Sequence, residues 1–546
     1  MYMRNQKFYA VLFGSLLALL IVFSLVLAGS GGFLSSVRML DNVVARISEN
    51  YVEEVNVDTL VSAGIYGMLA RLDPFSEFLE PKPLDQLVED TRGRFEGIGV
   101  EITIQADSLT VVTPLEGSPA SRVGLAAGDR IVAINGKPTT GMSTEDAARL
   151  LRGPKGSEVQ LAIMRSGQAE PLPFTITRGV IEIKAVPYYG VVGEGIGYVR
   201  LSRFSDQAGE ELSQAVAELK KESLAGLILD VRSNPGGLLE EAVETAELFL
   251  PPNQLVVETR GRRADQNQKF FSSKPPLLPD VPLVVAIDEG SASASEIVAG
   301  AIQDWDRGVV VGNPTFGKGL VQSLLGLPER RALKLTTARY YTPSGRSIQR
   351  PERAGRLQAD STAVEKFRTK KSGRLVAGGG GITPDVMTEK AKYTPLEIEL
   401  SRRALIWEFG VHYVFNHPNL TEDFDVTQSV VGEFRQFLKG KKFSYRSAAE
   451  EELKKLESLA KEAGFSKATQ KKIAELKAAL ESEKEREFQT SLSFIRRQLK
   501  ESILTKAFGD RAKYPLVWMK THPELVKAKE ILVSKDQYKK LLASAR

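Results

Sequence analysis

The sequence predicts an α/β multidomain protein: an apolar N-terminal helix, a small helical domain, an α+β module, an α/β core and a helical C-terminal region. The length of 546 residues exceeds what one hydrophobic core supports, about 250–300 residues. The hydrophobic pattern also changes several times along the chain, from helical to strand-like and back. The domain boundaries that these changes predict are, in chain order, 1–30, 31–92, 93–178, 179–392 and 393–546.

The N-terminal segment has the pattern of a membrane anchor. Residues 8–28 carry no charge and, at about 1.5 Å per residue, they span a hydrocarbon layer of about 30 Å. Arg4 and Lys7 precede this run, which favours a cytoplasmic N-terminus and an extracytoplasmic, periplasmic location for the rest of the chain. Val26-Leu27-Ala28 also suits signal peptidase, so a cleaved and exported form is the alternative; the length of the run favours the uncleaved anchor.

The composition excludes several kinds of chemistry. With 26% charged residues and a net charge of +5, the chain gives no support to nucleic-acid binding. The absence of cysteine rules out disulfides, thiolate nucleophiles and cysteine-based zinc sites. The three histidines, His412, His417 and His522, lie in the last quarter. An enzyme in the middle of the chain therefore has to use other bases, and we expect neither a cofactor nor a metal.

Residues 31–178 contain two patterns. Val44, Ile47 and Tyr51 have helical spacing within the first part, which ends in a proline-rich stretch. From residue 93, short β-rich runs alternate with Gly and Pro turns and with helical stretches near 118–123 and 144–151. The β-rich runs are Val100–Ile104, Leu109–Val112, Arg130–Ile134 and Val159–Arg165.

Residues 179–392 alternate apolar strands with helices. Strands that are apolar on both faces are typical of a parallel sheet covered on both sides. The stretch 356–381 is polar and indicates a surface excursion within the core. Beyond residue 393 the chain is helical and rich in Lys and Glu, which predicts a helical hairpin or small bundle with a solvated charged face. The four apolar strands of the core are Gly197–Leu201, Gly226–Val231, Leu283–Ile287 and Val309–Val311.

Two strand-to-helix turns carry residues suited to catalysis. The apolar strand Gly226–Val231 runs into Asn234-Pro235-Gly236-Gly237, where bare backbone N–H groups can bind an oxyanion or form only a tight turn. The apolar strand Leu283–Ile287 leads to Ser291-Ala292-Ser293-Ala294-Ser295 at a helix start, where the helix dipole favours an alkoxide. An ordinary N-cap serine is the alternative there. Further along, Lys318 lies between two glycines, a position that is usually only solvent-exposed.

Taken together and in this order, the motifs resemble the carboxyl-terminal processing (tail-specific) serine proteases, which combine a PDZ domain with a Ser-Lys catalytic dyad. The resemblance covers about residues 37–386. The motifs that carry it are Gly197–Arg200, Asp230–Gly237, Gly290–Glu296, Thr315–Gly319, Tyr341–Gly345 and Gly380–Asp385.

This resemblance implies a crotonase/ClpP-like α/β protease core and a role for each motif. Ser293 would be the nucleophile, Lys318 the general base and Gln322 the residue that orients the lysine. A lysine base must be neutral, which requires a pKa lowered from about 10.4 toward about 7–8. Burial near Phe316 and apolar strands would supply that shift. The oxyanion hole would consist of the backbone N–H groups of Ala294 and of Gly236 or Gly237.

The α+β module resembles the PDZ domain of these proteases. The resemblance makes Gly97-Ile98-Gly99-Val100 the loop that binds a peptide C-terminus while the peptide adds a strand. Arg152, at the end of the module's last helix, is either an ordinary surface residue or a link from peptide occupancy to the catalytic centre.

The function implied is that of a serine endopeptidase that acts on proteins with exposed apolar C-terminal tails. The alternatives are a catalytically silent PDZ scaffold and an acyl-transfer enzyme of crotonase-like fold. The presence of both Ser293 and Lys318 argues against the scaffold, and the PDZ module argues for a polypeptide substrate. The sequence leaves open the physiological substrate, a homo-oligomer, an adaptor and the role of residues 393–546.

Overall fold

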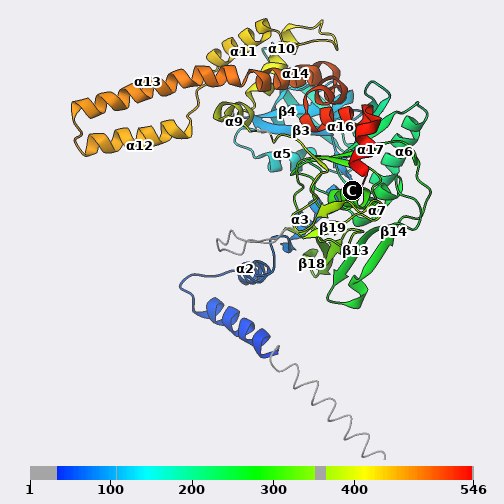
Figure 1. Cartoon of the computed structure of the whole chain (residues 1–546). Helices are drawn as coiled ribbons and strands as arrows, with labels where there is room; N and C mark the ends of the chain where they lie inside the picture. The colour runs from blue at the N-terminus through cyan, green and yellow to red at the C-terminus, as the bar shows by residue number, and fades with distance from the viewer. Residues whose placement is uncertain (1–33, 106, 166, 351–364, 391, 544–546) are drawn as a thin grey trace, which may run out of the picture. The chain divides into compact units, whose positions relative to one another are not determined.

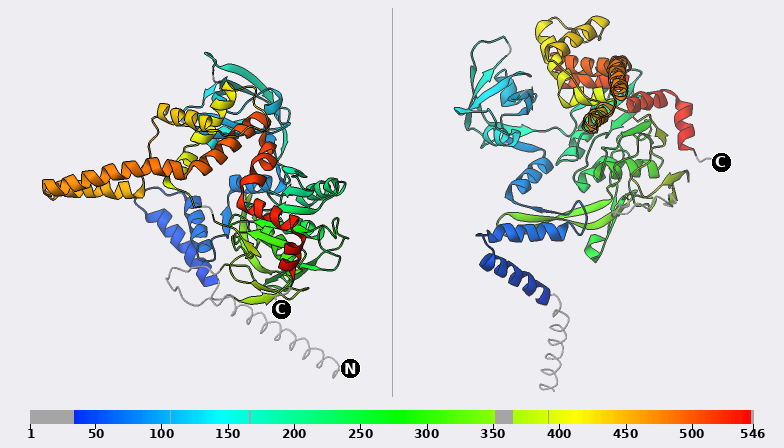
Figure 2. Two further views of the ribbon diagram at one scale, coloured as in Figure 1. Left: turned by 45° about the horizontal axis from the view of Figure 1, so that its top comes forward. Right: turned by 90° about the vertical axis from the view of Figure 1, so that its left-hand side faces the viewer.

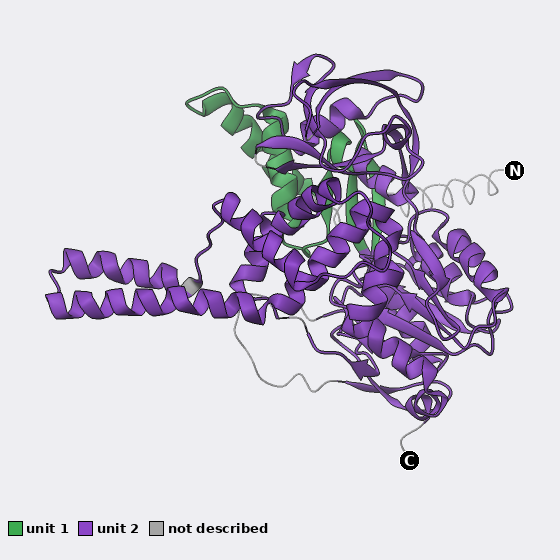
Figure 3. Cartoon of the chain, turned by 90° about the horizontal axis from the view of Figure 1, so that it is seen from above, with its two compact units in different colours: residues 1–84, 322–336 green, residues 85–321, 337–546 purple. Residues whose placement is uncertain are grey.

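A computed structural model describes residues 34–105, 107–165, 167–350, 365–390 and 392–543. The chain divides into two compact units (Figure 3), one within residues 1–84 and 322–336, the other within residues 85–321 and 337–546. The membrane helix expected over residues 8–28 lies outside the described residues. Among the helices that are described, none has both the length and the apolar character needed to cross a membrane.

The first unit contains helices and short strands (Figure 1). Residues 34–50 are helical, and α2 (Val57–Leu69) follows. β1 (Glu77–Leu79) pairs antiparallel with the first residues of β18 (Arg331–Tyr341), and β17 (Leu320–Leu327) pairs with β18 as well. The region expected to be purely helical therefore also holds a strand, which is too short to leave a periodic pattern in the sequence.

The second unit begins with an α+β module. Its sheet has the order β3-β4-β5-β7-β8, with β6 beside β5. Buried and exposed residues alternate along β7, as in a sheet with one face toward the core. α3 (Pro81–Arg92) precedes the module, and β2 (Arg94–Gly97) pairs with β9 (Gly179–Glu182) where the module begins and ends. The strands of the sheet and its helices are β3 (Val100–Gln105), β4 (Ser108–Pro114), β5 (Arg130–Ile134), β6 (Lys137–Pro138), β7 (Glu158–Met164), β8 (Leu172–Thr177), α4 (Pro119–Arg122) and α5 (Thr144–Leu151).

The α/β core is built on a six-stranded sheet. Its order is β10-β11-β12-β15-β16-β21, and all neighbours are parallel except β10 and β11. Every residue of β11, β12, β15 and β16 is buried, as expected for a parallel sheet covered on both faces. The strands are β10 (Tyr188–Val191), β11 (Ile196–Arg200), β12 (Gly226–Asp230), β15 (Leu283–Ile287), β16 (Val309–Gly312) and β21 (Val386–Met387).

Three helices cover one face of this sheet, with Leu229 and Val285 among the strand residues in their core. These helices are α6 (Ala208–Lys220), α7 (Leu239–Glu247) and α8 (Ala294–Asp304). Two small antiparallel pairs accompany the core, and the first of them continues from β13 to the last residues of β18. The pairs are β13 (Leu255–Gly261) with β14 (Gln268–Phe271) and β19 (Lys366–Arg368) with β20 (Leu375–Ala377).

The helical C-terminal region begins with a bundle around Phe409, Phe434 and Ile495. Its helices are α9 (Pro395–Arg402), α10 (Leu405–Asn416), α11 (Gln428–Gly440) and α14 (Leu492–Phe508). α12 (Ala448–Glu462) and α13 (Lys467–Thr490) form an antiparallel hairpin that extends away from this bundle (Figure 2). The hairpin has a small core of its own, which includes Leu453 and Ile473.

The last helices return to the six-stranded core sheet and cover its second face. They are the π-helical turn η3 (Tyr514–Trp518), α15 (Met519–Thr521), α16 (Pro523–Val533) and α17 (Lys535–Leu542). Ile228 and Val284 of the sheet pack with Leu525 and Leu532 of α16. The Leu283 N–H also donates a hydrogen bond of 3.0 Å to Tyr538 Oη. The C-terminal region therefore supplies one of the two helical layers of the core.

Candidate active site

Two loops follow adjacent parallel strands and meet at one edge of the core sheet. β12 and β15 are neighbours in register, so the loops after them leave the sheet at the same edge. The Ala292 N–H and the Ser295 hydroxyl both donate to the Asn234 carbonyl, at 3.0 and 2.9 Å. These bonds fix the Asn-Pro-Gly-Gly turn against the start of α8.

Ser293 is the N-cap residue of α8 and has an unusual backbone conformation. Its φ of 55° and ψ of −113° are sparsely populated by residues with a Cβ, at a cost of about 1–3 kcal/mol. Its N–H donates to Glu296 Oε2 at 2.8 Å, and its carbonyl accepts the Glu296 N–H at 2.9 Å. The side chain is partly exposed, so this serine is accessible at the helix start.

The buried carboxylate of Glu296 connects Ser293 to the loop of Lys318. Oε2 accepts the N–H groups of Ser293 and Lys318, each at 2.8 Å. Oε1 accepts the Gly317 N–H at 2.8 Å and the Thr315 hydroxyl at 2.5 Å. Burial raises the pKa of Glu296, and these four donors oppose that shift. One carboxylate thus holds both segments that carry the expected catalytic side chains.

Tyr340, which the sequence did not single out, lies beside the same two residues. It is only 2% exposed, and its hydroxyl donates to the Lys318 carbonyl oxygen. Burial and the nearby Glu296 carboxylate raise the pKa of Tyr340 well above its usual value, whereas a side-chain hydrogen bond with Ser293 lowers it. Its position at the end of a strand with a second tyrosine gave no signal of this contact.

The glycine turn packs directly on the serine. A Cβ on Gly236 would lie 2.8 Å from Ser293 Cβ and 3.0 Å from the Ala294 nitrogen, so only glycine fits there. The Gly236 N–H is already used, because it donates to Asn234 Oδ1 at 2.9 Å. A Cβ on Gly237 would lie 2.1 Å from the Phe204 carbonyl oxygen. Among the described residues, the Gly237 N–H has no hydrogen-bond acceptor.

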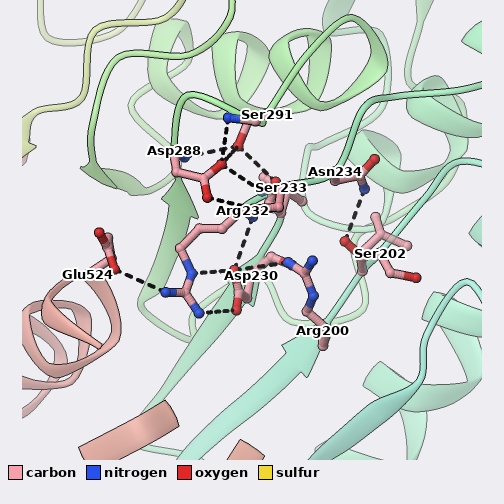
Figure 4. Close-up of polar contacts among 12 residues, drawn as sticks. Arg200, Ser202, Asp230, Arg232, Ser233, Asn234, Asp288, Ser291 and Glu524 are labelled. Atoms are coloured by element: carbon pink, nitrogen blue, oxygen red, sulfur yellow. Dashed lines mark hydrogen bonds and ion pairs between the residues drawn. The ribbon is translucent and has the colours of Figure 1, made fainter. Parts of the chain in front are cut away.

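A buried charge network lies directly before this turn (Figure 4). Asp230, which is fully buried, accepts two bonds from the Arg232 guanidinium, at 2.9 and 2.8 Å, and forms an ion pair of 3.3 Å with Arg200. Although burial raises the pKa of Asp230, the Arg232 and Arg200 charges outweigh it and hold the pKa well below its usual range. Ser233, with φ of 50°, donates its N–H and hydroxyl to Asp288 at 2.6 and 2.9 Å.

The loop Gly97-Ile98-Gly99-Val100 turns its carbonyl groups into the α+β module. The Ile98 carbonyl accepts the Ala120 N–H, and the Gly99 carbonyl accepts the Leu115 N–H, each at 2.9 Å. In a trans peptide the N–H of the next residue points the opposite way. The N–H groups of Gly99 and Val100 therefore point away from the module's interior, as binding of a carboxylate at this loop requires.

Comparison with known proteins identifies the domains. Residues 195–358 match peptidase family S41, residues 110–165 match a PDZ domain, and residues 396–532 match the C-terminal helical domain of probable PDZ-proteases. A carboxy-terminal-processing protease from Bartonella bacilliformis is 36% identical over 371 residues, which cover 67% of this chain and 78% of that protein. The chain belongs to the carboxyl-terminal-processing protease family.

Two further relatives of this protease are a curated sequence and a solved structure. A carboxyl-terminal-processing protease from Synechocystis is 40% identical over 289 residues, covering 52% of this chain and 67% of that protein. The photosystem II D1 C-terminal processing protease is 31% identical, covers 63% of this chain and 86% of that structure, and has a TM-score of 0.36. The sequence-based identification of the family, the PDZ domain and the peptidase is confirmed.

Two expected site residues of the protease have contacts that the sequence did not indicate. Arg152 ends α5, where its guanidinium pairs with Glu89 at 2.5 Å and lies 5.1 Å from the centre of the Phe95 ring. This position connects the PDZ domain to α3 and β2. Gln322 lies on β17 in the first compact unit, where its amide donates to the Phe75 carbonyl oxygen.

Proposed function

We propose that this protease is an endopeptidase with Ser293 as nucleophile and Lys318 as general base. The observation that carries the proposal is the shared Glu296 carboxylate. The backbone nitrogens of Ser293 and Lys318 both lie 2.8 Å from its Oε2 atom. The strained backbone of Ser293 at the start of α8 supports its role as nucleophile. The family resemblance assigns Gln322 the task of orienting the lysine, and this assignment stays a prediction.

The positions of the histidines support a lysine base independently. His412 lies on α10 and contacts Asn416, and His417 ends the same helix and contacts Tyr413. His522 lies at the start of α16 next to Arg232, where burial and the Arg232 charge lower the pKa of the imidazole to about 3. An imidazole with that pKa is a poor base at neutral pH.

The proposed reaction proceeds through an acyl-enzyme. Ser293 Oγ attacks the carbonyl carbon of the scissile bond while Lys318 Nζ accepts the hydroxyl proton. The N–H groups of Gly237 and Ala294 stabilise the oxyanion, since the Gly236 N–H is engaged by Asn234. The C–N bond then breaks, and Lys318 returns the proton to the departing amine. Water attacks the ester with Lys318 as base, which releases the new carboxylate and restores Ser293.

We also propose that the PDZ domain selects substrates by their C-termini. The outward N–H groups of Gly99 and Val100 would bind the terminal carboxylate, and the peptide would add a strand beside β3. Ile98, Ala147 and Leu151, which share the core of this domain, lie on the elements that flank such a groove. An apolar last residue of the substrate suits this environment.

We propose further that residues 8–28 anchor the protease in a membrane, with the catalytic part in the periplasm. The charge-free run and the preceding Arg4 and Lys7 support this placement. Membrane fractions washed with alkaline carbonate should retain the full-length chain and lose a variant that begins at residue 31. Release of the full-length chain by the same wash would contradict an integral anchor.

The test of the catalytic proposal is incubation of the purified protein with a denatured protein substrate. The wild type should produce fragments, whereas Ser293→Ala and Lys318→Ala should not. Lys318→Arg should also be inactive, because a guanidinium stays protonated at any usable pH. Cleavage by Ser293→Ala would refute the nucleophile. Binding of tailed peptides without cleavage by the wild type would support a PDZ scaffold instead, and acyl transfer without cleavage would support the crotonase-like alternative.

A further inference from the structure

The C-terminal segment contacts the side chain of Arg232, which lies directly before the proposed oxyanion turn. Glu524, in the first turn of α16, accepts a bond from Arg232 Nη1 at 3.0 Å. His522 Nδ1 lies 2.9 Å from the same nitrogen, and the Trp518 ring lies 5.6 Å from the guanidinium carbon. These contacts connect residues that are about 290 positions apart in the chain.

Glu524 completes the charge balance of a buried cluster. On the core sheet, Arg200 and Arg232 share the single carboxylate of Asp230, and in the intact chain the side chains of all three are at most 8% exposed. With the segment docked but without a charge on Glu524, one positive charge would be uncompensated in this buried site, which is strongly unfavourable. The Glu524 carboxylate, 14% exposed, supplies the second negative charge. His522 remains neutral near pH 7, because burial and Arg232 lower its pKa to about 3.

The same arginine begins the turn that carries the proposed oxyanion donor. The Arg232 N–H donates to Asp230 Oδ1 at 3.1 Å, so main chain and side chain are held by one carboxylate. The next residue, Ser233, has a left-handed backbone and is bonded twice to Asp288. A shift of Arg232 would therefore change the path of the chain into Asn234 and Gly237.

We propose that Glu524 and His522 are positioning residues for the oxyanion turn, and that the C-terminal segment 514–533 is thereby part of the catalytic machinery. The inference rests on the proposed function, because it gives this segment a role at the same site. Docking of α16 fixes Arg232, Arg232 fixes the start of the turn, and the turn presents the Gly237 N–H to the oxyanion. Neither residue contacts the substrate in this scheme.

The decisive variant is Glu524→Gln, which keeps the shape of the side chain and removes its charge. With a chromogenic peptide substrate, we expect kcat to fall about tenfold with KM nearly unchanged, because misplacement of a donor affects the transition state most. The inhibition constant of a peptidyl boronate, which forms a tetrahedral adduct at the serine, should rise by a similar factor. Glu524→Asp, which keeps the charge, should recover most of the loss.

Lys529→Met is the matched control. Lys529 lies on the same helix and pairs with Glu194 at 3.4 Å, away from the turn. This variant removes a docking contact of α16 without touching Arg232, so its kcat should equal that of the wild type. Equal kcat values for Glu524→Gln and the wild type would overturn the inference. Equal losses in Glu524→Gln and Lys529→Met would also overturn it, because they would show only weaker docking.

Peptide cleavage by the wild type and by Ser293→Ala distinguishes a failure of this inference from a failure of the proposed function. If the wild type cleaves no peptide, or if Ser293→Ala remains active, the assignment of the catalytic site fails and the inference fails with it. If the wild type is active and Ser293→Ala is inactive, the site stands, and the Glu524 variants alone decide the inference. Should Glu524→Gln not fold, the Glu524→Asp and Arg232→Lys variants provide the same comparison of kcat with KM, with loss expected for Arg232→Lys and activity for Glu524→Asp.

Discussion

At the scale of single residues, the Glu296 carboxylate joins the start of α8 to the loop that carries Lys318. Glu296 is the third residue of α8, where a carboxylate caps the helix start by accepting the N–H of the N-cap residue. Because it also accepts the N–H groups of Gly317 and Lys318, it ties the loop after β16 to this helix. A common capping arrangement thereby positions two segments of the proposed catalytic site.

Replacing Glu296 by Gln should therefore reduce both activity and stability. The amide nitrogen of Gln cannot accept a bond, so at least one buried N–H loses its partner, and the free energy of unfolding should fall by about 2 kcal/mol. We expect kcat to fall about tenfold to 100-fold, because the serine and lysine loops separate. Urea denaturation and peptide turnover measure the two effects.

Glu397→Gln provides the control for this prediction. Glu397 holds the same capping position in α9, where it accepts the Thr394 N–H at 3.0 Å, and it is similarly buried. It should lose stability while kcat stays unchanged. A Glu296→Gln enzyme with wild-type kcat would show that the shared carboxylate does not position the two catalytic loops.

At the scale of elements, the Asn-Pro-Gly-Gly turn is held on every side. The Asn234 side chain donates to the Leu201 carbonyl oxygen at 3.0 Å and accepts the Gly236 N–H. The Phe204 N–H donates to the Gly236 carbonyl, and the Leu238 N–H donates to the Phe204 carbonyl. Such a turn can present a preorganised N–H without rearrangement during the reaction.

Gly237→Val should damage chemistry more than binding. The added Cβ would collide with the Phe204 carbonyl and displace the Gly237 N–H. We expect kcat to fall about 100-fold or more with little change in KM. Gly136→Ala is the control, since Gly136 also has a positive φ, of 76°, but open space around its Cβ position. An effect of Gly237→Val on KM alone would identify a substrate-binding loop.

The PDZ loop leads to a prediction about the substrate. Amidation of a substrate's C-terminus removes the carboxylate that the Gly99 and Val100 N–H groups would bind, at roughly 1.5–3 kcal/mol for each charge-assisted bond. Cleavage of the amidated peptide should be at least tenfold slower than that of the free acid. An internal control is a peptide with the same scissile sequence and an unrelated tail. Equal rates for acid and amide would refute recognition of the C-terminus.

The elements that the sequence predicted correctly are those with a strong local pattern. β11, β12, β15 and β16 were evident as apolar runs because both of their faces are buried. Ser293, Lys318 and the glycines were singled out because motifs carry them, and their catalytic roles stay predictions. Tyr340 and β1 were missed, since one contact made from the end of a strand and a strand of three residues leave no periodic signal.

At the scale of the whole molecule, the C-terminal segment shows what sequence patterns cannot predict. Its helical character was evident, but its place on the core sheet depends on contacts between residues that are hundreds of positions apart. The Tyr538 hydroxyl contacts Leu283, and Leu532 packs so closely over Gly226 that a Cβ on this glycine would lie 2.8 Å from Leu532 Cδ2. A pattern of apolar residues shows which face of a helix is buried, but it does not identify the element that covers this face.

Docking of this segment should make stability depend on pH through His522. Burial and the Arg232 charge lower the pKa of His522 to about 3 in the folded protein, whereas an unfolded histidine has a pKa of about 6.5. Between these values the unfolded chain binds one more proton, so acid favours unfolding. The free energy of unfolding should fall by up to about 1.4 kcal/mol per pH unit from this group as the pH decreases from about 6 to 4.

His522→Asn isolates this contribution, because asparagine keeps an acceptor near Arg232 and does not titrate. Urea denaturation at a series of pH values should give the wild type a steeper loss of stability below pH 6 than the variant, while the two curves run parallel above pH 7. Parallel curves for the wild type and His522→Asn over the whole range would mean that the imidazole stays accessible to protons, and that the contact of α16 with Arg232 is looser than the 2.9 Å distance indicates.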